Sequence, residues 1–379
     1  MSRTLVVTND YPPRPGGIQA FVHGYVSRLP DVVVYAPAWK GADAFDAALD
    51  YPVIRHPGSL MLPGPSVLRR AREIARAEGC TAVWFGAAAP LGLLAPALRR
   101  AGVQRSVATT HGHEVGWAML PGARRTLRRI ARGVDVLTYL GPYTRDRLAP
   151  ALGRYAGRLA HLPTGVDTAA FRPDAQGAQL RQRLGLGGRP VVVCVSRLVP
   201  RKGQDVLIRA WPQIRRRVPG AALLLVGGGP FRPALERLVR EHDVAADVVF
   251  TGSVPWSELP AHYGAGDVFA MPCRTRRRGL EVEGLGIVYL EASASGLPVV
   301  AGDSGGAPDA VLDGHTGHVV DGRDITALAE RVVGLLDDPA AARAMGAAGR
   351  AWVERVWRWE VLVPRLAALL AAGSGSPPA

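Results

Sequence analysis

The chain has 379 residues, of which 48% are hydrophobic and 21% charged, and its formal net charge is +14. This length predicts two domains rather than one, and the apolar content supports sizeable cores and argues against general disorder. The three cysteines, Cys80, Cys194 and Cys273, are widely spaced and form no CxxC pair, which argues against a disulfide framework or a zinc site and for a reducing, cytosolic setting. The positive charge predicts acidic partners: nucleic acid, anionic lipid or a phosphorylated substrate.

Short β-branched runs alternate with amphipathic segments in the first part of the chain. Residues 4–10 predict a strand, with no charged-then-apolar secretory leader before it. Residues 16–29 predict a helix, because their apolar side chains follow the helical repeat. Further strand-like runs follow at residues 31–37, 81–86, 105–112 and 134–141. This alternation of strands and helices predicts a parallel sheet covered on both faces.

The stretch 82–98 carries no charge and could be taken for a membrane span. It is slightly short for a bilayer and contains Pro90 and Pro96, so we favour a buried strand followed by a buried helix.

A second alternating series follows a turn-rich segment at residues 162–177, which we interpret as the interdomain connection. Strands are expected at residues 191–198, 221–229, 247–254, 267–272, 298–303 and 317–321. Ala-rich amphipathic helices are expected within 325–372, and residues 373–379 predict a disordered tail. The simplest interpretation is an α/β protein of two Rossmann-like domains that face each other across a cleft, with ligands at the carboxyl ends of the strands.

Glycines interrupt the loop between the first strand and its helix. Gly16 and Gly17 leave the backbone uncovered where the helix N-terminus exposes free N–H groups, which suits a phosphate or an approaching sugar. A plain glycine-rich turn explains the pair equally well. The loop is not a dinucleotide fingerprint, because it lacks the G-x-G-x-x-G frame.

Two cations follow the first strand of the second domain. Arg197 and Lys202 would emerge at its carboxyl end, where they could neutralise a pyrophosphate. A solvated basic loop is the alternative. Lys202 weakens that alternative, because Lys40 is the only other lysine in an arginine-rich chain.

The segment "EGLGIVYLEASASG" at residues 283–296 places two carboxylates around glycines at the start of a predicted helix. The glycines let backbone N–H groups face a phosphate. Glu283 could reach a sugar hydroxyl, and Glu291, two turns along, could accept hydrogen bonds from ribose hydroxyls. A capping glutamate with a second glutamate by chance remains the alternative.

His111 follows a strand of the first domain and could contact a substrate or be a satisfied loop histidine. No D-x-D pair occurs in the chain, so the compact carboxylate pair that would carry a metal-bound nucleotide is missing and no metal is expected.

The segments 283–311 and 196–205 and the "TGVD" junction at 164–167 resemble the retaining glycosyltransferases of the double-Rossmann (GT-B) type. The signature of that family is a glutamate, seven residues and a second glutamate, here Glu283 and Glu291. Within the family, residues 9–19 and 111–122 resemble actinobacterial enzymes that add mannose from GDP-mannose to phosphatidylinositol monomannoside.

The resemblance implies different roles for different parts of the chain. Residues 1–165 would form the acceptor-binding and membrane-facing domain, and 166–350 the domain that binds the nucleotide sugar. Residues 351–372 would form a helix that packs back toward the first domain. Leu285 stands where the family commonly has Phe, and it keeps an apolar side chain. Thr164 stands where the family commonly has Asn, a change that the similar actinobacterial enzymes share.

The resemblance also implies roles for single residues. Arg197 and Lys202 would bind the donor pyrophosphate and stabilise its developing charge, Glu283 would hold the transferred sugar, and Glu291 the ribose. The remaining positions would line the donor, the sugar or the acceptor. They are Gly286 and Ile287 near the phosphates, Val254 near the base, Gly16 and Gly17 between donor and acceptor, His111 on the sugar, and Asp10 and Gln19 facing the acceptor.

The implied function is retaining transfer of mannose from GDP-mannose to a phosphatidylinositol mannoside, without a metal cofactor, at the inner face of the plasma membrane. One alternative is a transferase with another nucleotide sugar, UDP- or GDP-linked, and a different glycolipid or soluble acceptor. A second is a non-catalytic protein that binds nucleotide or lipid. No nucleic-acid recognition module is visible, and the sequence leaves the oligomeric state open.

An arginine-rich helix is predicted at residues 121–135. Its arginines share one face, while Leu127, Ile130, Ala131 and Val134 would pack on the domain. We call this face the arginine stripe: Arg124, Arg125, Arg128, Arg129 and Arg132. Met61 and Leu62 are expected to be exposed beside a second arginine group, Arg69, Arg70, Arg72 and Arg76. Together these features predict peripheral binding to an anionic membrane surface, although a solvated face is the alternative.

Overall fold

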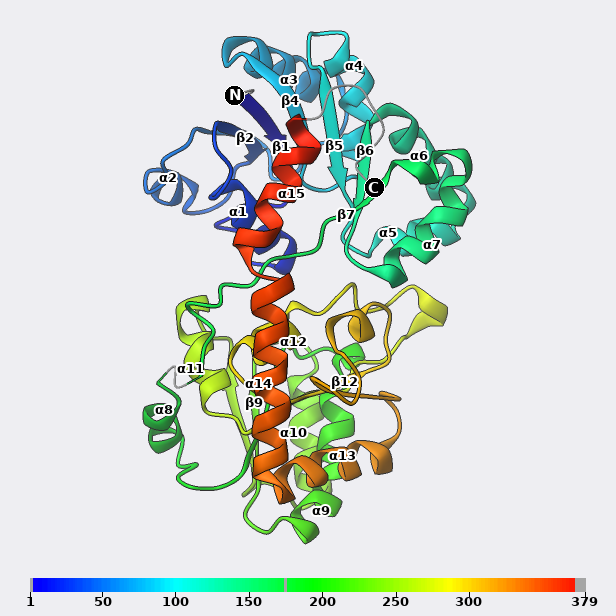
Figure 1. Cartoon of the computed structure of the whole chain (residues 1–379). Coiled ribbons are helices and arrows are strands. Elements are labelled where there is room, and N and C mark those ends of the chain that lie inside the picture. The colour runs from blue at the N-terminus through cyan, green and yellow to red at the C-terminus, as the bar shows by residue number, and fades with distance from the viewer. Residues whose placement is uncertain (1–2, 174–175, 372–379) are drawn as a thin grey trace. The chain divides into compact units, whose positions relative to one another are not determined.

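The computed structural model describes residues 3–173 and 176–371. The chain forms two compact units (Figure 1). The first comprises residues 3–165 and 359–371, and the second is Val166–Arg358. The predicted tail at 373–379 lies outside the described residues.

The first unit contains a parallel seven-stranded sheet in the order β3-β2-β1-β4-β5-β6-β7. Its strands are β1 (Arg3–Val7), β2 (Val32–Pro37), β3 (Val53–His56), β4 (Cys80–Phe85), β5 (Arg105–Thr109), β6 (Val136–Tyr139) and β7 (Leu159–His161). Its α-helices are α1 (Gly17–Val26), α2 (Ala42–Asp46), α3 (Pro65–Ala77), α4 (Ala95–Arg99), α5 (Glu114–Met119), α6 (Pro121–Gly133), α7 (Pro142–Leu152) and α15 (Trp359–Ala371). The predicted parallel sheet is confirmed, and the two edge strands β3 and β7 are additions to it.

The uncharged stretch at 82–98 is a buried strand followed by short helices, as expected. It comprises most of β4, the 3-10 helix Leu91–Leu94 and α4, and its apolar side chains join the core of the first unit. Within residues 3–173 and 176–371, no helix is both long and apolar enough to cross a bilayer.

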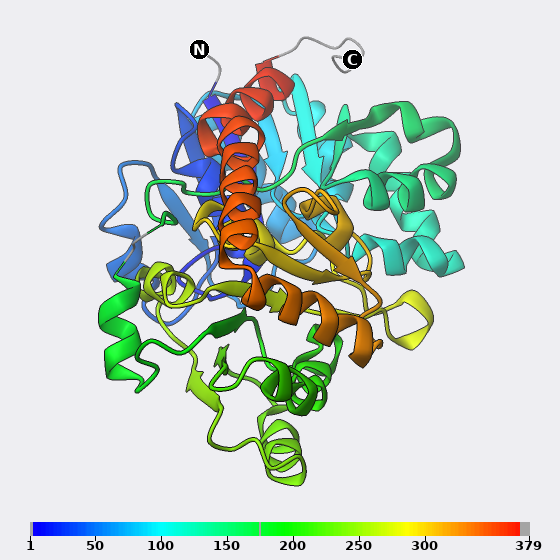
Figure 2. The same cartoon turned by 60° about the horizontal axis from the view of Figure 1, so that its bottom comes forward.

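The second unit contains a parallel six-stranded sheet in the order β10-β9-β8-β11-β12-β13. Its strands are β8 (Val191–Val195), β9 (Ala222–Val226), β10 (Val248–Gly252), β11 (Val268–Met271), β12 (Val299–Gly302) and β13 (Gly317–Val320). Its α-helices are α8 (Gly177–Arg183), α9 (Gln204–Arg217), α10 (Arg232–Glu241), α11 (Leu259–Gly264), α12 (Ile287–Ala294), α13 (Ile325–Asp337) and α14 (Pro339–Val356). α14 packs against α12, and α13 against α9; the long orange α14 can be followed in Figure 2.

Each sheet reverses its strand order once. The reversal lies between β1 and β4 in the first unit and between β8 and β11 in the second. Loops diverge to opposite faces of a sheet at such a point and leave a crevice outside the carboxyl ends of the two strands. Ligand-binding residues are therefore expected in the loops after β1, β4, β8 and β11.

The chain returns to the first unit at Trp359. The predicted boundary after residue 350 lies inside α14, which belongs to the second unit and continues to Val356. The indole ring of Trp359 packs edge-on against Tyr25, with ring centroids 5.0 Å apart. A Cβ atom on Gly24 or Gly165 would lie 2.3 Å from that ring, so these glycines leave the space that the indole fills. At the far end of α15, the carbonyl of Leu369 accepts a hydrogen bond from Arg105 Nε at 2.8 Å.

Candidate active site

The loops after β8 and β11 bring two cations onto one carboxylate. Lys202 Nζ donates to Glu283 Oε2 at 2.6 Å, and a guanidinium nitrogen of Arg201 donates to the same oxygen at 2.7 Å. Glu283 and Lys202 are both 8% exposed. The backbone N–H of Glu283 donates to Ser304 Oγ at 3.3 Å, and its carbonyl accepts from the N–H of Gly306 at 2.9 Å. The predicted sugar-binding carboxylate is therefore held firmly at both its main chain and its side chain.

Glu283 is ionised in this environment. Burial raises the pKa of its carboxyl, but the charges and hydrogen bonds of Lys202 and Arg201 outweigh burial and bring the pKa below its ordinary value. No hydrogen bond reaches the second oxygen, Oε1, from the residues that the structure describes. That oxygen is a free acceptor for a hydroxyl group.

Gly286 makes the turn that follows Glu283. Its φ is 82°, in the left-handed region, and a Cβ atom there would lie 2.5 Å from the ring of Tyr289. The backbone N–H groups of Gly286 and Ile287, at the start of the eight-residue α12, have no acceptor within the described chain. They remain available to an anion, as the glycine pattern predicts.

Glu291 lies on α12 and is buried, at 6% exposure. Tyr263 Oη donates to Glu291 Oε2 at 2.7 Å. Burial raises the pKa of Glu291 to about 7, although the Tyr263 hydrogen bond lowers it in part. The ionised form accepts more hydrogen bonds than the protonated form, so a ligand whose hydroxyls donate to Glu291 favours loss of its proton.

The other residues predicted to bind the sugar donor lie at the same carboxyl edge of the sheet of the second unit. Arg197 follows β8, is exposed, and has no hydrogen bond or ion pair through its side chain to any described residue. Val254 follows β10 and is half-buried. We call Arg197, Arg201, Lys202, Glu283 and Glu291 the C-terminal cluster. Sequence reasoning missed Arg201, because an arginine beside a lysine gives little signal in a chain this rich in arginine.

The glycine loop after β1 carries the predicted acceptor residues. Gln19 Nε2 donates to Asp10 Oδ1 at 2.8 Å. A Cβ atom on Gly16 would lie 2.1 Å from Gln19 Oε1, whereas a Cβ atom on Gly17 would meet nothing within 4 Å. A side chain at position 16 would thus have to displace the amide group of Gln19, whereas Gly17 borders open space that a ligand could enter.

His111, after β5, is held in one tautomer. Its Nε2 lies 2.5 Å from the carbonyl of Gly86, so this nitrogen donates. Burial lowers the pKa of His111 to about 3, which keeps the ring neutral and leaves Nδ1 as an acceptor. Its backbone N–H donates to Glu114 Oε2 at 2.9 Å, and Glu114 Oε1 lies 3.2 Å from His113 Nε2. Sequence reasoning did not single out the buried Glu114, which resembles an ordinary first-turn glutamate.

The arginine stripe lies on α6, and its opposite side is packed as predicted. Leu127, Ile130, Ala131 and Val134 are fully buried. Four of the arginines are exposed and Arg124 is half-buried. Arg128 Nε donates to the carbonyl of Ala151 at 2.6 Å. None of the five forms an ion pair within the described parts of the chain.

The expected exposure of Met61 is wrong. Met61 is 0% exposed because Asn9 receives its N–H at 2.7 Å and donates to its carbonyl at 2.9 Å, which turns the side chain inward. Its neighbours Leu60 and Leu62 are 56% and 59% exposed. The expected exposure of Leu62 is therefore confirmed. Just before α6, Met119 and Leu120, which were not predicted, are also exposed.

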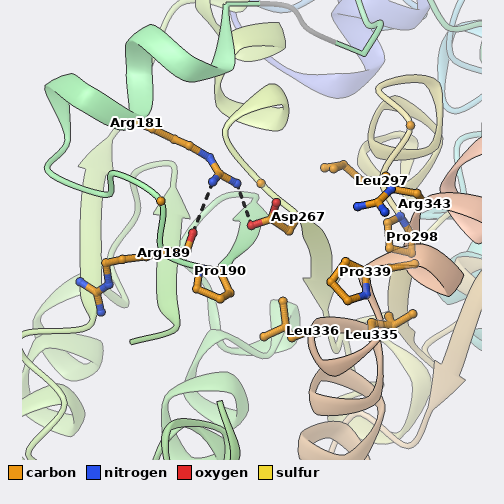
Figure 3. Close-up of a pocket in the computed structure, with 14 residues that line it drawn as sticks. Arg181, Arg189, Pro190, Asp267, Leu297, Pro298, Leu335, Leu336, Pro339 and Arg343 are labelled. Atoms are coloured by element: carbon orange, nitrogen blue, oxygen red, sulfur yellow. Dashed lines mark hydrogen bonds and ion pairs between the residues drawn. The ribbon is translucent and has the colours of Figure 1, made fainter. Parts of the chain in front are cut away.

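A cavity of about 310 Å³ lies in the second unit at the amino ends of β8, β11 and β12 (Figure 3). Arg181 on its wall is fully engaged: it donates to Asp267 at 2.7 Å, to the carbonyl of Ala265 at 2.9 Å and to that of Arg189 at 3.3 Å. The predicted residues all follow the carboxyl ends of the strands, so this cavity is not the candidate site. In the described ranges, no group of three or more His, Cys, Asp and Glu side chains is arranged to hold a metal ion.

Two family models together span most of the chain: "Glycosyltransferase Family 4" matches residues 16–170 and "Glycosyl transferases group 1" matches residues 178–352. The chain belongs to the GT-B glycosyltransferases and is an enzyme of that class.

The relatives are more specific. The chain is 58% identical, over 97% of each chain, to the GDP-mannose-dependent alpha-(1-6)-phosphatidylinositol monomannoside mannosyltransferase of Mycolicibacterium smegmatis. It is 49% identical, again over 97% of each, to the GDP-mannose-dependent monoacylated alpha-(1-6)-phosphatidylinositol monomannoside mannosyltransferase of Corynebacterium glutamicum.

Solved structures share the fold. Anabaena HepE, crystallised with UDP and glucose, superposes with a TM-score of 0.83 at 19% identity and covers 98% of this chain and 100% of its own. Sucrose-phosphate synthase of Thermosynechococcus elongatus gives a TM-score of 0.78 at 23% identity, over 97% of this chain and 98% of its own.

Proposed function

We propose that this protein transfers mannose from GDP-mannose to phosphatidylinositol monomannoside with retention of the anomeric configuration. The observation that carries the proposal is the buried, ionised Glu283 with a free Oε1 beside Lys202. The full-length identity to mannosyltransferases of that specificity supports the choice of donor and acceptor.

The donor is held by the C-terminal cluster. Lys202 and the unpaired Arg197 bind the diphosphate, the free N–H groups of Gly286 and Ile287 add to them, and Glu291 accepts hydrogen bonds from the ribose. Val254 lies near the base. Glu283 Oε1 accepts from hydroxyls of the mannose, and His111 Nδ1 is a second acceptor for that sugar. Asp10 and Gln19 contact the acceptor.

Transfer proceeds on one face of the sugar. The bond from the anomeric carbon to the phosphate oxygen breaks as the acceptor oxygen forms a bond on the same face. The acceptor hydroxyl gives its proton to the departing phosphate oxygen, while Lys202 and Arg197 stabilise the charge that develops there. The step balances without a metal ion, and none is proposed as a cofactor.

The site works at a membrane surface. The arginine stripe has no carboxylate partners among the described residues, and the exposed Leu60, Leu62, Met119 and Leu120 supply apolar contact. An amphipathic, basic surface of this kind suits peripheral binding to anionic lipid, here the inner face of the plasma membrane where the acceptor resides.

Incubation of the purified protein with labelled GDP-mannose and phosphatidylinositol monomannoside tests the proposal. The expected product is the same lipid with one more mannose in α-linkage. Thermal shifts with GDP and UDP give an independent result, because a ligand bound by the folded state raises the melting temperature. A larger shift with UDP, or transfer only from a UDP-sugar, would favour the alternative donor; absence of transfer from any nucleotide sugar would favour a non-catalytic role.

A further inference from the structure

One carboxylate oxygen of Glu283 accepts hydrogen bonds from two cations. Lys202 Nζ lies 2.6 Å and an Arg201 guanidinium nitrogen 2.7 Å from Oε2. One positive charge is enough to neutralise the carboxylate, so the second is in excess in the nucleotide-free protein. The question is which cation stays with Glu283 when a diphosphate binds.

The two cations are anchored differently. Lys202 is a point charge on a flexible stem, and two of its three N–H donors have no partner in the described structure. Both residues have a backbone hydrogen bond: the carbonyl of Arg201 accepts from the N–H of Arg274 at 2.9 Å, and the N–H of Lys202 donates to the carbonyl of Val199 at 3.0 Å. The side chain of Arg201 also directs a guanidinium nitrogen toward the carbonyl of Val282 at 3.5 Å, whereas the side chain of Lys202 makes polar contact with Glu283 alone among the described residues. Lys202 therefore has fewer side-chain contacts to lose and is the cation that we expect to reorient.

We propose that Arg201 is a positioning residue that holds Glu283 in place and ionised while Lys202 turns to the donor diphosphate. The inference rests on the proposed function, because it takes Lys202 as a ligand of the donor. Glu283 Oε2 stays bonded to Arg201, and Oε1 remains directed to the sugar hydroxyls. The carboxylate of Glu283 therefore keeps its orientation when Lys202 leaves it for the diphosphate.

The surroundings of Glu283 explain why one cation must remain. Burial raises the pKa of Glu283, and the charges of Lys202 and Arg201 counter it. A bound diphosphate would offset the charge of Lys202. The other titratable groups that face Glu283 are Cys273, after β11, and Tyr289, on α12; both have raised pKa values through burial and are neutral. Arg201 is then the remaining cation that pairs with Glu283 among the described residues.

Arg201→Gln tests the inference in the full-length protein with GDP-mannose and the lipid acceptor. We expect kcat to fall on the order of 100-fold, as for a misplaced catalytic group. The Kd for GDP should stay within about threefold, because Lys202 and Arg197 are retained. The acidic limb of the kcat profile should move to higher pH, since Glu283 would gain a proton more readily. Arg201→Lys keeps the charge, and should restore the acidic limb and part of kcat.

Arg181→Gln is the matched control. The side chain of Arg181 is 20% exposed and pairs with Asp267 at 2.7 Å, against 22% and 2.7 Å for Arg201 and Glu283. It lies at the amino edge of the same sheet, by the cavity in Figure 3. The carboxylate partners differ, since the side chain of Asp267 is 46% exposed and that of Glu283 only 10%. Loss of an ion pair from an arginine of similar exposure at this edge should leave kcat and the acidic limb unchanged.

The outcomes separate the inference from the function on which it rests. If the wild-type protein transfers no mannose, the proposed function fails. If it does and Arg201→Gln keeps its kcat, or loses GDP affinity as strongly as Lys202→Ala, Arg201 is not a positioning residue. Should Arg201→Gln fail to fold, Arg201→Lys decides: unchanged GDP affinity with a normal acidic limb supports the inference, and a clear loss of GDP affinity overturns it.

Discussion

Arginine occupies two opposite electrostatic settings in this protein. In the loop after β8, Arg201 joins Lys202 on the buried carboxylate of Glu283, so both cations have an acidic partner within the fold although their two charges exceed its one. On α6, the arginine stripe faces outward and has no carboxylate partner among the described residues. A net charge of +14 therefore does not describe one kind of partner. We propose that the paired cations hold the catalytic geometry, and we expect the exposed, unpaired cations to attract a large anionic surface.

The largest effect on transfer is expected for Glu283→Gln, which removes the negative charge that pairs with Arg201 and Lys202. The amide keeps the shape but accepts fewer hydrogen bonds, so transfer should fall on the order of 1,000-fold. GDP binding should persist, because Lys202 is released from its carboxylate. Product formation and calorimetric GDP binding measure the two effects; transfer at near the wild-type rate would remove Glu283 from the mechanism.

Removal of exposed arginines from the arginine stripe should release the protein from membranes. Replacement of Arg125, Arg129 and Arg132 by Ser spares Arg128, whose hydrogen bond to Ala151 supports the fold. At roughly 1 kcal/mol per arginine, binding to vesicles containing phosphatidylinositol should weaken about 100-fold. Flotation with these vesicles measures the binding. The binding of the wild-type protein should weaken as the salt concentration rises.

The matched control for the stripe replaces three exposed arginines of the second unit, Arg216, Arg237 and Arg240, by Ser. It makes the same change in net charge and should leave flotation nearly unchanged. Equal losses in the two triple variants would mean that overall charge, not the stripe, drives binding.

A third comparison concerns the two predicted phosphate ligands. Lys202→Ala should weaken GDP binding by about 2 kcal/mol, or roughly 30-fold, because a buried charge-assisted contact is lost. Arg197→Ala should cost about 1 kcal/mol, since this side chain is exposed and its contact is screened. Titration calorimetry compares them. Complete loss of activity on addition of a chelator, restored by magnesium or manganese, would contradict phosphate binding by side chains alone.

The smallest predicted effect is a pH dependence of nucleotide binding. Burial raises the pKa of Glu291 to about 7 in the nucleotide-free protein, and in the proposed complex the ribose hydroxyls would bind its ionised form. Binding should release a proton, so GDP affinity should rise about tenfold between pH 6 and pH 8 as the ionised fraction grows. Glu291→Gln should bind more weakly and lose this part of the pH dependence. An identical pH profile in the variant would separate Glu291 from the ribose.

Periodicity predicted most of the fold, because strands that are buried on both faces appear as continuous apolar runs. All six strands of the second unit fall within predicted segments, as do β2, β5 and β6 of the first, and β1 and β4 begin one residue before theirs. β3 and β7 were missed because they are short edge strands whose residues are only half-buried, so their composition does not differ from that of a loop. The predicted site residues fall at the carboxyl ends of strands, and their roles in binding remain predictions.

The sequence by itself determined the two series of strands and helices and the positions of Glu283, Glu291, Arg197 and Lys202 beside predicted strand ends. Local patterns are sufficient for this, because burial and turn formation act on neighbouring residues. Only the tertiary structure decided which groups meet. It placed Arg201 on Glu283, 82 residues away, and turned Met61 inward while its two neighbours stayed exposed. It also fitted Trp359 into the space that Gly24 and Gly165 leave open. Such contacts depend on how distant segments pack, and a side chain's own neighbours in the sequence do not specify them.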